Sequence, residues 1–251
     1  IPHPFFVEGG ALAVENALKV AFDWKIRKNL EKGVKNKGKQ IIHYKQAFHG
    51  RSGYTLSLTN TTDPRKTMYF PKFDWPRVTN PYMKFPFTSD EEKNIKDAEN
   101  KSILEIKSAL KKNKDDIAAI IIEPIQGEGG DNFFRDEYFV ALREICDEND
   151  VLLIFDEVQT GIGITGKMWC YEHYSIKPDI ISFAKKAQVG GILASKRIDE
   201  VPNNVFVESS RINSTFGGNL VDMVRFRIIL ETIKEEKLLK NSKDVGNYLL
   251  L

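Results

Sequence analysis

Apolar residues are spaced along the chain in two different patterns. Short, nearly continuous apolar runs favour buried strands, and these fall at residues 5–7, 41–44, 117–122, 151–155 and 179–183, with a further short run at 192–194. Apolar positions three or four residues apart predict amphipathic helices, and these fall at 11–30, 89–112, 136–149 and 221–239. Because strands alternate with helices of this length, we expect an α/β fold with a mostly parallel sheet and helices on both of its faces.

Three polar segments interrupt this alternation. Residues 31–38 are rich in lysine and predict a connection on the surface. Residues 59–88 contain many prolines, asparagines and aromatic residues without sustained periodicity, and a long irregular loop of this kind is usually functional or packed against a partner. Residues 211–218 predict a polar loop before the last helix.

Charge and hydropathy exclude several classes of protein. The 37 basic and 35 acidic residues leave a net charge of +2, so we expect no strong attraction to nucleic acid. No apolar run approaches the roughly 20 residues that span a membrane, and no signal peptide is visible. Cys146 and Cys170 have no metal-ligand spacing, so we expect no metal site and a reducing, cytoplasmic location.

Both ends of the chain suggest a piece of a longer protein. The sequence lacks an initiator methionine and begins directly with a strand. It stops at residues 247–251, inside an apparent helix. We therefore expect further segments on both sides of it.

Two polar residues follow neighbouring apolar strands and are candidates for catalysis. Asp156 comes directly after the strand at 151–155, and Lys185 follows the strand at 179–183. The carboxyl ends of parallel strands face the crevice where open α/β sheets bind ligands. Alone, Asp156 could equally cap a helix or pair with a lysine, and Lys185 could be an exposed surface residue. Together they are the pair that pyridoxal phosphate needs, a lysine for the Schiff base and an acid for the pyridine nitrogen.

Other residues could complete such a cofactor site. Gly10 and Ala11 open a helix after a strand, where free backbone N–H groups could bind a phosphate, although a simple tight turn also explains the glycine. Thr215 could contact a phosphate or cap the next helix. Phe48 and His49 could stack on a planar cofactor or belong to the core.

Two charged residues are candidates for substrate selection. Arg51 could hold a carboxylate through two parallel hydrogen bonds. Glu128 lies between Gly127 and Gly129, in a loop whose backbone can approach a ligand closely. Both residues could equally form surface salt bridges. The same loop lacks the glycine spacing of a nucleotide-binding motif, so we discount nucleotide binding.

These segments resemble the class III aminotransferases, which belong to the fold-type I pyridoxal phosphate enzymes. The motifs Ile-Phe-Asp-Glu-Val-Gln-Thr-Gly at 154–161 and Pro-Asp-Ile-Ile-Ser-Phe-Ala-Lys at 178–185 have the order and spacing of that family, except that Ala184 replaces its usual glycine. Segments 5–18, 47–60, 70–76 and 213–219 are similar to its lysine-acting members. The resemblance implies that 1–251 is the cofactor-binding large domain, with a mostly parallel seven-stranded sheet. The family's N-terminal segment and C-terminal small domain are expected outside it.

The resemblance also implies roles for the cofactor-binding residues. Lys185 is expected to form the Schiff base and Asp156 to pair with the pyridinium nitrogen. Gln159 is expected near the ring hydroxyl, with Val158 against one ring face and Phe48, beside His49, against the other. Gly10 and Ala11 are expected to bind the phosphate, and Thr215 to reach the phosphate of the neighbouring subunit in a homodimer with shared active sites.

The substrate residues follow from the same resemblance. Arg51 and, from the neighbouring subunit, Asn213 are expected to hold the α-carboxylate of L-lysine. Glu128 is expected to mask an arginine and to release it for L-glutamate; this arginine is expected in the C-terminal domain. The implied reaction transfers the ε-amino group of L-lysine to 2-oxoglutarate. Its products are L-glutamate and 2-aminoadipate 6-semialdehyde, which cyclises to piperideine-6-carboxylate. The alternatives are another ω-aminotransferase, for 4-aminobutyrate or ornithine, or a fragment without catalytic activity.

Overall fold

A seven-stranded sheet forms the centre of the protein, which is represented by a computed structural model that describes residues 2–250. Its strand order is β1-β9-β8-β7-β4-β2-β3. The strands are β1 (His3–Val7), β2 (Gln40–Tyr44), β3 (Arg77–Val78), β4 (Ile117–Ile122), β7 (Leu152–Asp156), β8 (Ile180–Phe183) and β9 (Gly190–Ala194). Strands β8, β7, β4, β2 and β3 run parallel, and β9 runs antiparallel to both β8 and β1. The expected α/β fold with a mostly parallel sheet is confirmed.

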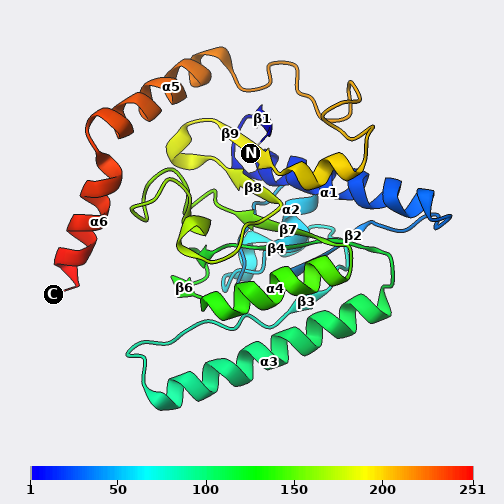
Figure 1. The fold of residues 1–251 in the computed structure, drawn as a ribbon, viewed down its shortest axis with the longest axis horizontal. Coiled ribbons are helices and arrows are strands. Elements are labelled where there is room, and N and C mark those ends of the chain that lie inside the picture. Colours follow the sequence, from blue (N-terminus) through cyan, green and yellow to red (C-terminus); the bar gives the residue numbers. More distant parts are fainter. Residues whose placement is uncertain (1, 251) are drawn as a thin grey trace.

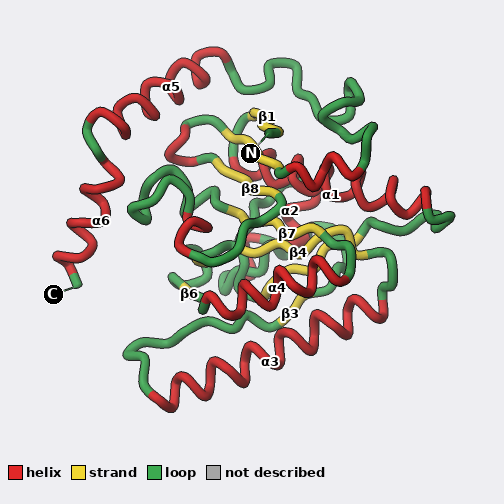
Figure 2. The backbone as a smooth tube through the Cα atoms, viewed as in Figure 1, coloured by secondary structure: helices red, strands yellow, loops and turns green. Residues whose placement is uncertain are grey.

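Helices cover both faces of this sheet (Figures 1 and 2). Helix α1 (Gly10–Glu31) packs on one face with the short α2 (Gly53–Leu58), and α3 (Ser89–Lys112) and α4 (Asp136–Glu148) pack on the other. The side chains of β4 are buried along its whole length and are divided between the two faces. A strand covered on both faces needs such a continuous apolar run, which is why the sequence at 117–122 predicts it.

The last two helices lie outside these two helical layers. Helices α5 (Leu220–Glu235) and α6 (Leu238–Leu249) form an arc at the edge of the molecule, orange to red in Figure 1. The prediction of a single helix at 221–239 is therefore wrong in its extent. The helix is interrupted between α5 and α6 because Lys237 adopts a left-handed backbone conformation, with φ of 53°.

Two smaller features differ from the expected pattern. The segment at 59–88 is mostly irregular, as predicted, but contributes the two-residue strand β3 to the edge of the sheet. The loop after β4 contains a small hairpin of β5 (Ile125–Gln126) and β6 (Asn132–Phe133). Among the described residues, no helix is both long and apolar enough to cross a membrane.

Candidate active site

The carboxyl ends of β7 and β8 open into a cavity of about 450 Å³. This volume lies within the range of roughly 300 to 1,000 Å³ that is usual for small-molecule sites. Its walls contain every predicted site residue except Asn213 and Thr215, namely Gly10, Ala11, Phe48, His49, Arg51, Glu128, Asp156, Val158, Gln159 and Lys185. Residues from five separate parts of the sequence therefore meet in one place.

Asp156 forms part of the cavity wall and is 4% exposed. It is the last residue of β7 and lies opposite Ser182 of β8 in the sheet register. Its carboxylate accepts hydrogen bonds from His49 Nδ1 at 2.8 Å, Ser182 Oγ at 3.0 Å and the backbone N–H of Val158 at 3.1 Å. Three donors hold this carboxylate in one orientation and compensate for its removal from water.

His49 lies behind Asp156 and is 2% exposed. Because a carboxylate only accepts hydrogen bonds, His49 Nδ1 donates to it. The other ring nitrogen, Nε2, is buried without a hydrogen-bond partner among the described residues. The ring therefore supports Asp156 from behind, whereas the partly exposed ring of Phe48 forms cavity wall.

Lys185 begins the 3-10 helix Lys185–Ala187, directly after Ala184 at the end of β8. Its backbone is left-handed, with φ of 48°, a conformation that costs a side-chain-bearing residue about 1 kcal/mol or more. Its amine donates a hydrogen bond to Gln159 Oε1 at 2.7 Å. The neighbouring Lys186 instead donates to the backbone carbonyl of Gln159 at 2.5 Å, and burial lowers the pKa of its amine. Only Lys185 lines the cavity.

The N-terminus of α1 forms another wall of the cavity. Gly9 precedes the helix with φ of 79°, and no acidic residue stands in the first turn. A Cβ atom on Gly10 would lie 2.8 Å from a methyl group of Val158, so glycine is required for this close approach. A Cβ atom on Gly50 would lie 2.8 Å from the Cβ of Ala11, which shows that the loop carrying Phe48 and His49 packs directly against this helix end.

Glu123 also lines the cavity, and the sequence pattern did not single it out. It follows β4 directly, as Asp156 ends β7, so its position after an apolar strand was the available signal. Its Oε1 accepts the backbone N–H of Phe48 at 2.8 Å. Burial, and then the nearby charge of Asp156, raise the pKa of the Glu123 carboxyl well above its usual range.

The two predicted substrate residues lie at the rim of the cavity. Arg51 is exposed, and its guanidinium has no hydrogen bond to any described residue. Glu128 forms an ion pair with Lys66, a residue of the irregular loop that sequence reasoning did not identify. Such a pairing depends on tertiary contact across 62 positions of sequence, which no local pattern reveals.

Asn213 and Thr215 lie outside this cavity, and their side chains are exposed. The loop that carries them is attached to the middle of α1. Arg211 donates to the buried carboxylate of Asp23 at 2.5 Å, and Arg27 donates to both oxygens of the same carboxylate at 3.1 Å. Within one chain, the structure therefore does not bring Asn213 and Thr215 to the ten predicted site residues that line the cavity.

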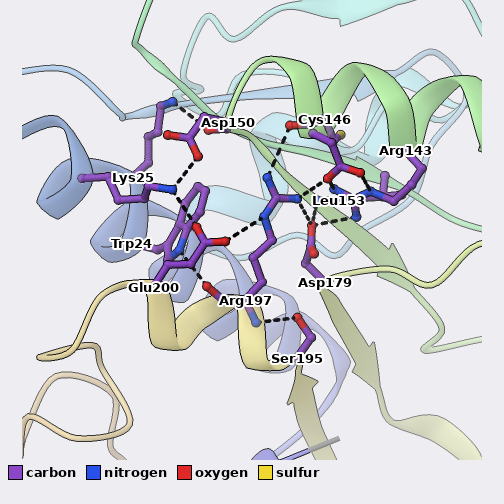
Figure 3. A network of polar contacts seen from close by, with 12 residues as sticks. Trp24, Lys25, Arg143, Cys146, Asp150, Leu153, Asp179, Ser195, Arg197 and Glu200 are labelled. Carbon is purple, nitrogen blue, oxygen red and sulfur yellow. Dashed lines mark hydrogen bonds and ion pairs between the residues drawn. The ribbon is translucent and has the colours of Figure 1, made fainter.

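A second polar network holds β7 and β8 together at their opposite ends (Figure 3). Asp179, just before β8, accepts from the backbone N–H of Leu153 at 2.8 Å. Arg143 and Arg197 converge on the same carboxylate, at 2.9 and 3.2 Å. Arg197 also lies near the ring of Trp24 on α1. The strand pair is thus fixed at both ends.

The cavity fits pyridoxal phosphate in its donor chemistry. The amine of Lys185, the buried carboxylate of Asp156 and the N–H groups at Gly10 and Ala11 match the aldehyde, ring nitrogen and phosphate of that cofactor. The side chains of Phe48 and Val158 provide apolar surface for a planar ring. The backbone approach at Gly10 would be filled by any Cβ atom.

Comparisons with known proteins agree with this chemistry. The chain is 55% identical over 250 residues to the L-lysine-epsilon aminotransferase of Mycobacterium tuberculosis (strain ATCC 25618 / H37Rv), which covers 99% of this chain and 55% of that protein. It is 50% identical over 250 residues to the L-lysine-epsilon aminotransferase of Amycolatopsis lactamdurans, again covering 99% and 55%. The chain thus spans little more than half the length of the curated relatives it matches.

A solved structure and a family model extend the comparison. The lysine aminotransferase from M. tuberculosis matches with a TM-score of 0.95 and 54% identity, covering 99% of this chain and 57% of that one. The model of the family described as aminotransferase class-III matches residues 3–251. The resemblance noted in the sequence is confirmed, and the chain belongs to the class III aminotransferases, a family of pyridoxal-phosphate-dependent enzymes.

Proposed function

We propose that the protein is an L-lysine 6-aminotransferase, which transfers the ε-amino group of L-lysine to 2-oxoglutarate and releases 2-aminoadipate 6-semialdehyde and L-glutamate. The observation that carries the proposal is the meeting of Asp156 and Lys185 in one cavity at the N-terminus of α1. The two M. tuberculosis matches and the A. lactamdurans match, all named for lysine, support the choice of substrate.

Pyridoxal phosphate would be held by the residues of this cavity. Lys185 would hold its aldehyde, Asp156 its ring nitrogen, and the N–H groups of Gly10 and Ala11 its phosphate. Phe48 and Val158 would enclose the ring. Gln159, which accepts a hydrogen bond from Lys185, would lie at the ring hydroxyl. When bound, the cofactor supplies an electron sink for the bond that breaks at the amine-bearing carbon.

Lys185 would then move the proton. Its Nζ would take a proton from the amine-bearing carbon of the substrate and return it at the next stage, as a general acid and base. Gln159 Oε1, at 2.7 Å, would orient this amine. Asp156 would keep its orientation toward the ring nitrogen during this transfer because His49, Ser182 and the N–H of Val158 all donate to it.

Substrate orientation is assigned to the rim of the cavity. Arg51 would hold the α-carboxylate of lysine, which leaves the distal amine to enter toward Lys185. Glu128 would mask an arginine during the lysine half-reaction and release it for glutamate. We infer that this arginine belongs to a further domain of the protein.

A homodimer with shared sites would complete the binding residues. Asn213 and Thr215 lie outside their own chain's cavity, and Asn213 would contact the substrate carboxylate and Thr215 the phosphate in the neighbouring subunit. Phe216, Leu220 and Val221 follow them and are 75%, 82% and 66% exposed. Exposed apolar side chains gathered in this way mark surfaces that bind other proteins.

The reaction would take place in the cytoplasm. Cys146 and Cys170 are both buried and unpaired, as is usual for proteins kept in a reducing compartment.

Product analysis tests the proposal directly. Purified full-length protein, incubated with L-lysine, 2-oxoglutarate and pyridoxal phosphate, is expected to form the semialdehyde and glutamate in equal amounts. A panel of amine donors separates the rivals, because a preference for 4-aminobutyrate or ornithine would contradict the lysine assignment but not the cofactor. Added pyridoxal phosphate is expected to give an absorbance band near the visible edge that Lys185→Ala abolishes. Absence of this band in the unaltered protein would sink the cofactor assignment.

A further inference from the structure

Glu123 is a second buried carboxyl group in the wall of the cavity. Glu123 is 5% exposed, and its side chain reaches the cavity from the end of β4. Oε1 accepts the N–H of Phe48 at 2.8 Å, which is the one hydrogen bond of this carboxyl to the described residues. No lysine, arginine or histidine of the described chain forms an ion pair with it.

The groups around Glu123 decide which of the two carboxyls carries a proton. Asp156 on β7, Lys185 after β8 and Glu128 at the rim all act on Glu123 electrostatically. Two neighbouring buried carboxyls do not both ionise readily, because each negative charge disfavours the other. Asp156 has three hydrogen-bond donors and Glu123 has one. This difference in donors favours a proton on Glu123, and the raised pKa of Glu123 agrees with it.

A protonated Glu123 has a defined use in the cavity. Its hydrogen bond fixes the backbone of Phe48, whose ring forms a cavity wall. The other oxygen has no partner among the described residues and, as an O–H group, can donate a hydrogen bond into the cavity. We propose that Glu123 is a positioning residue that acts as a neutral acid, an inference that rests on the proposed cofactor site. Glu123 would fix Phe48 against the cofactor and would leave Asp156 as the negative charge for the ring nitrogen.

Two substitutions in the full-length protein separate a neutral role from a charged one. Glu123→Gln keeps an oxygen acceptor for Phe48 and a donor for the cavity but cannot ionise. Its Kd for pyridoxal phosphate is expected to stay within about threefold of the unaltered value, whereas Glu123→Ala, which removes the hydrogen bond, weakens binding about threefold to tenfold. The matched control is Glu105, which also accepts a backbone N–H, that of Thr79 at 2.6 Å, but lies outside the cavity. Glu105→Ala is expected to leave the Kd unchanged.

The absorbance of the bound cofactor distinguishes a neutral Glu123 from an ionised one, because loss of a nearby negative charge would shift its titration. Since a neutral Glu123 adds no charge, the pH midpoint of the Lys185-dependent band is expected to move by less than about 0.3 pH unit in Glu123→Gln. Three results would each overturn the proposal: a Kd in Glu123→Gln as weak as in Glu123→Ala, a midpoint shift of about 0.5 unit or more, or equal weakening by Glu105→Ala.

Unfolding without cofactor tests the protonation even if the proposed function fails. A folded-state pKa above the unfolded value makes the unaltered protein lose stability as pH rises between those two values. Relative to Glu123→Gln, its unfolding equilibrium constant is expected to rise with pH, by at most about tenfold per pH unit, once the pH exceeds the unfolded-chain pKa of about 4.3. A ratio that does not change with pH would show that Glu123 is ionised and would overturn the neutral role. Failure of the cofactor assignment would instead appear as a missing absorbance band in the unaltered protein.

Discussion

Asp156 shows how a single buried charge is maintained at the end of an apolar strand. Its carboxylate leaves water but gains two side-chain donors and one backbone donor. Of these, His49 comes from a position 107 residues away and Ser182 from the adjacent strand. The carboxylate is thereby positioned to pair with a cationic ring nitrogen.

Removing only the charge of this residue is expected to weaken the cofactor. Asp156→Asn keeps the size of the side chain but loses the charge-assisted pairing, which is worth about 1.5–3 kcal/mol. The Kd for pyridoxal phosphate, measured by absorbance titration, is expected to rise about tenfold to a hundredfold. Asp222→Asn, which alters a carboxylate paired with Arg225 on α5, serves as the control. Equal affinity in Asp156→Asn and the unaltered protein would contradict the role given to Asp156.

At the scale of single residues, the sequence predicts which polar residues follow strands and face the site. It does not predict which other side chains hydrogen-bond to them. Asp156 and Lys185 are predictable because each follows a short apolar run that favours a buried strand. Glu123 occupies an equivalent place, but the glycines that flank Glu128 make that residue the more conspicuous candidate in the sequence. His49 and Ser182 could not be assigned to Asp156, because their contacts depend on how the strands and loops come together.

The pair of β7 and β8 is the element that sets the distance between the acid and the lysine. Hydrogen bonds to Asp156 fix one end of the pair, and the Asp179 network fixes the other. Asp179 and its two arginines are largely buried, so each partner depends on the others for compensation of its charge.

Breaking this network is expected to cost far more than breaking a surface pair. Asp179→Ala would leave Arg143 and Arg197 partly uncompensated, with an expected loss of about 3–5 kcal/mol in the free energy of unfolding. Asp147, which contacts the same two arginines but has a side chain that is 58% exposed, provides the matched control. Asp147→Ala is expected to cost less than about 1 kcal/mol. Urea unfolding of both variants measures the difference, and similar losses in the two would refute the argument.

The elements themselves were predictable to the extent that burial imposes a pattern. The sequence predicts strands β4 and β7 because both of their faces are covered, so their residues are apolar throughout. It predicts helices α3 and α4 because one face of each helix is apolar. Strand β3 has only two residues, too few for any period. The break between α5 and α6 lies at Lys237, with no glycine or proline to announce it.

The stability of the whole molecule should depend on pH through a buried histidine. His43 on β2 bonds to the carbonyl of Leu58 at 3.1 Å, and burial lowers its pKa to about 3. In the unfolded chain its pKa is near 6.5, so the unfolded state binds the proton more tightly. Its contribution is therefore complete above pH 6.5 and is lost progressively as the pH falls toward 3.

A variant without this titration should resist mild acid better than the unaltered protein. Between pH 7.5 and 5, unaltered protein is expected to lose about 2 kcal/mol more than His43→Asn, which can still donate to Leu58 but does not ionise. Chemical unfolding at the two pH values gives the comparison. Parallel losses in both proteins would mean that His43 does not govern the acid response.

Assembly of the proposed dimer can be tested by mixing two damaged subunits. Lys185→Ala removes a residue of the subunit's own site, while Asn213→Ala removes one assigned to the partner's site. In a random mixture of the two variants, half of the dimers are mixed and each restores one complete site. The expected activity is about a quarter of the unaltered value. No recovery after unfolding and joint refolding would show that both residues serve one site within a single chain.

The left-handed backbone at Lys185 has a consequence for the stability of the turn that carries it. A residue with a side chain is held there at φ of 48°, where glycine would fit with less steric cost. Glycine would thus relieve the steric cost of this turn. The fold tolerates that cost at Lys185, and in return the turn presents an amine to the cavity.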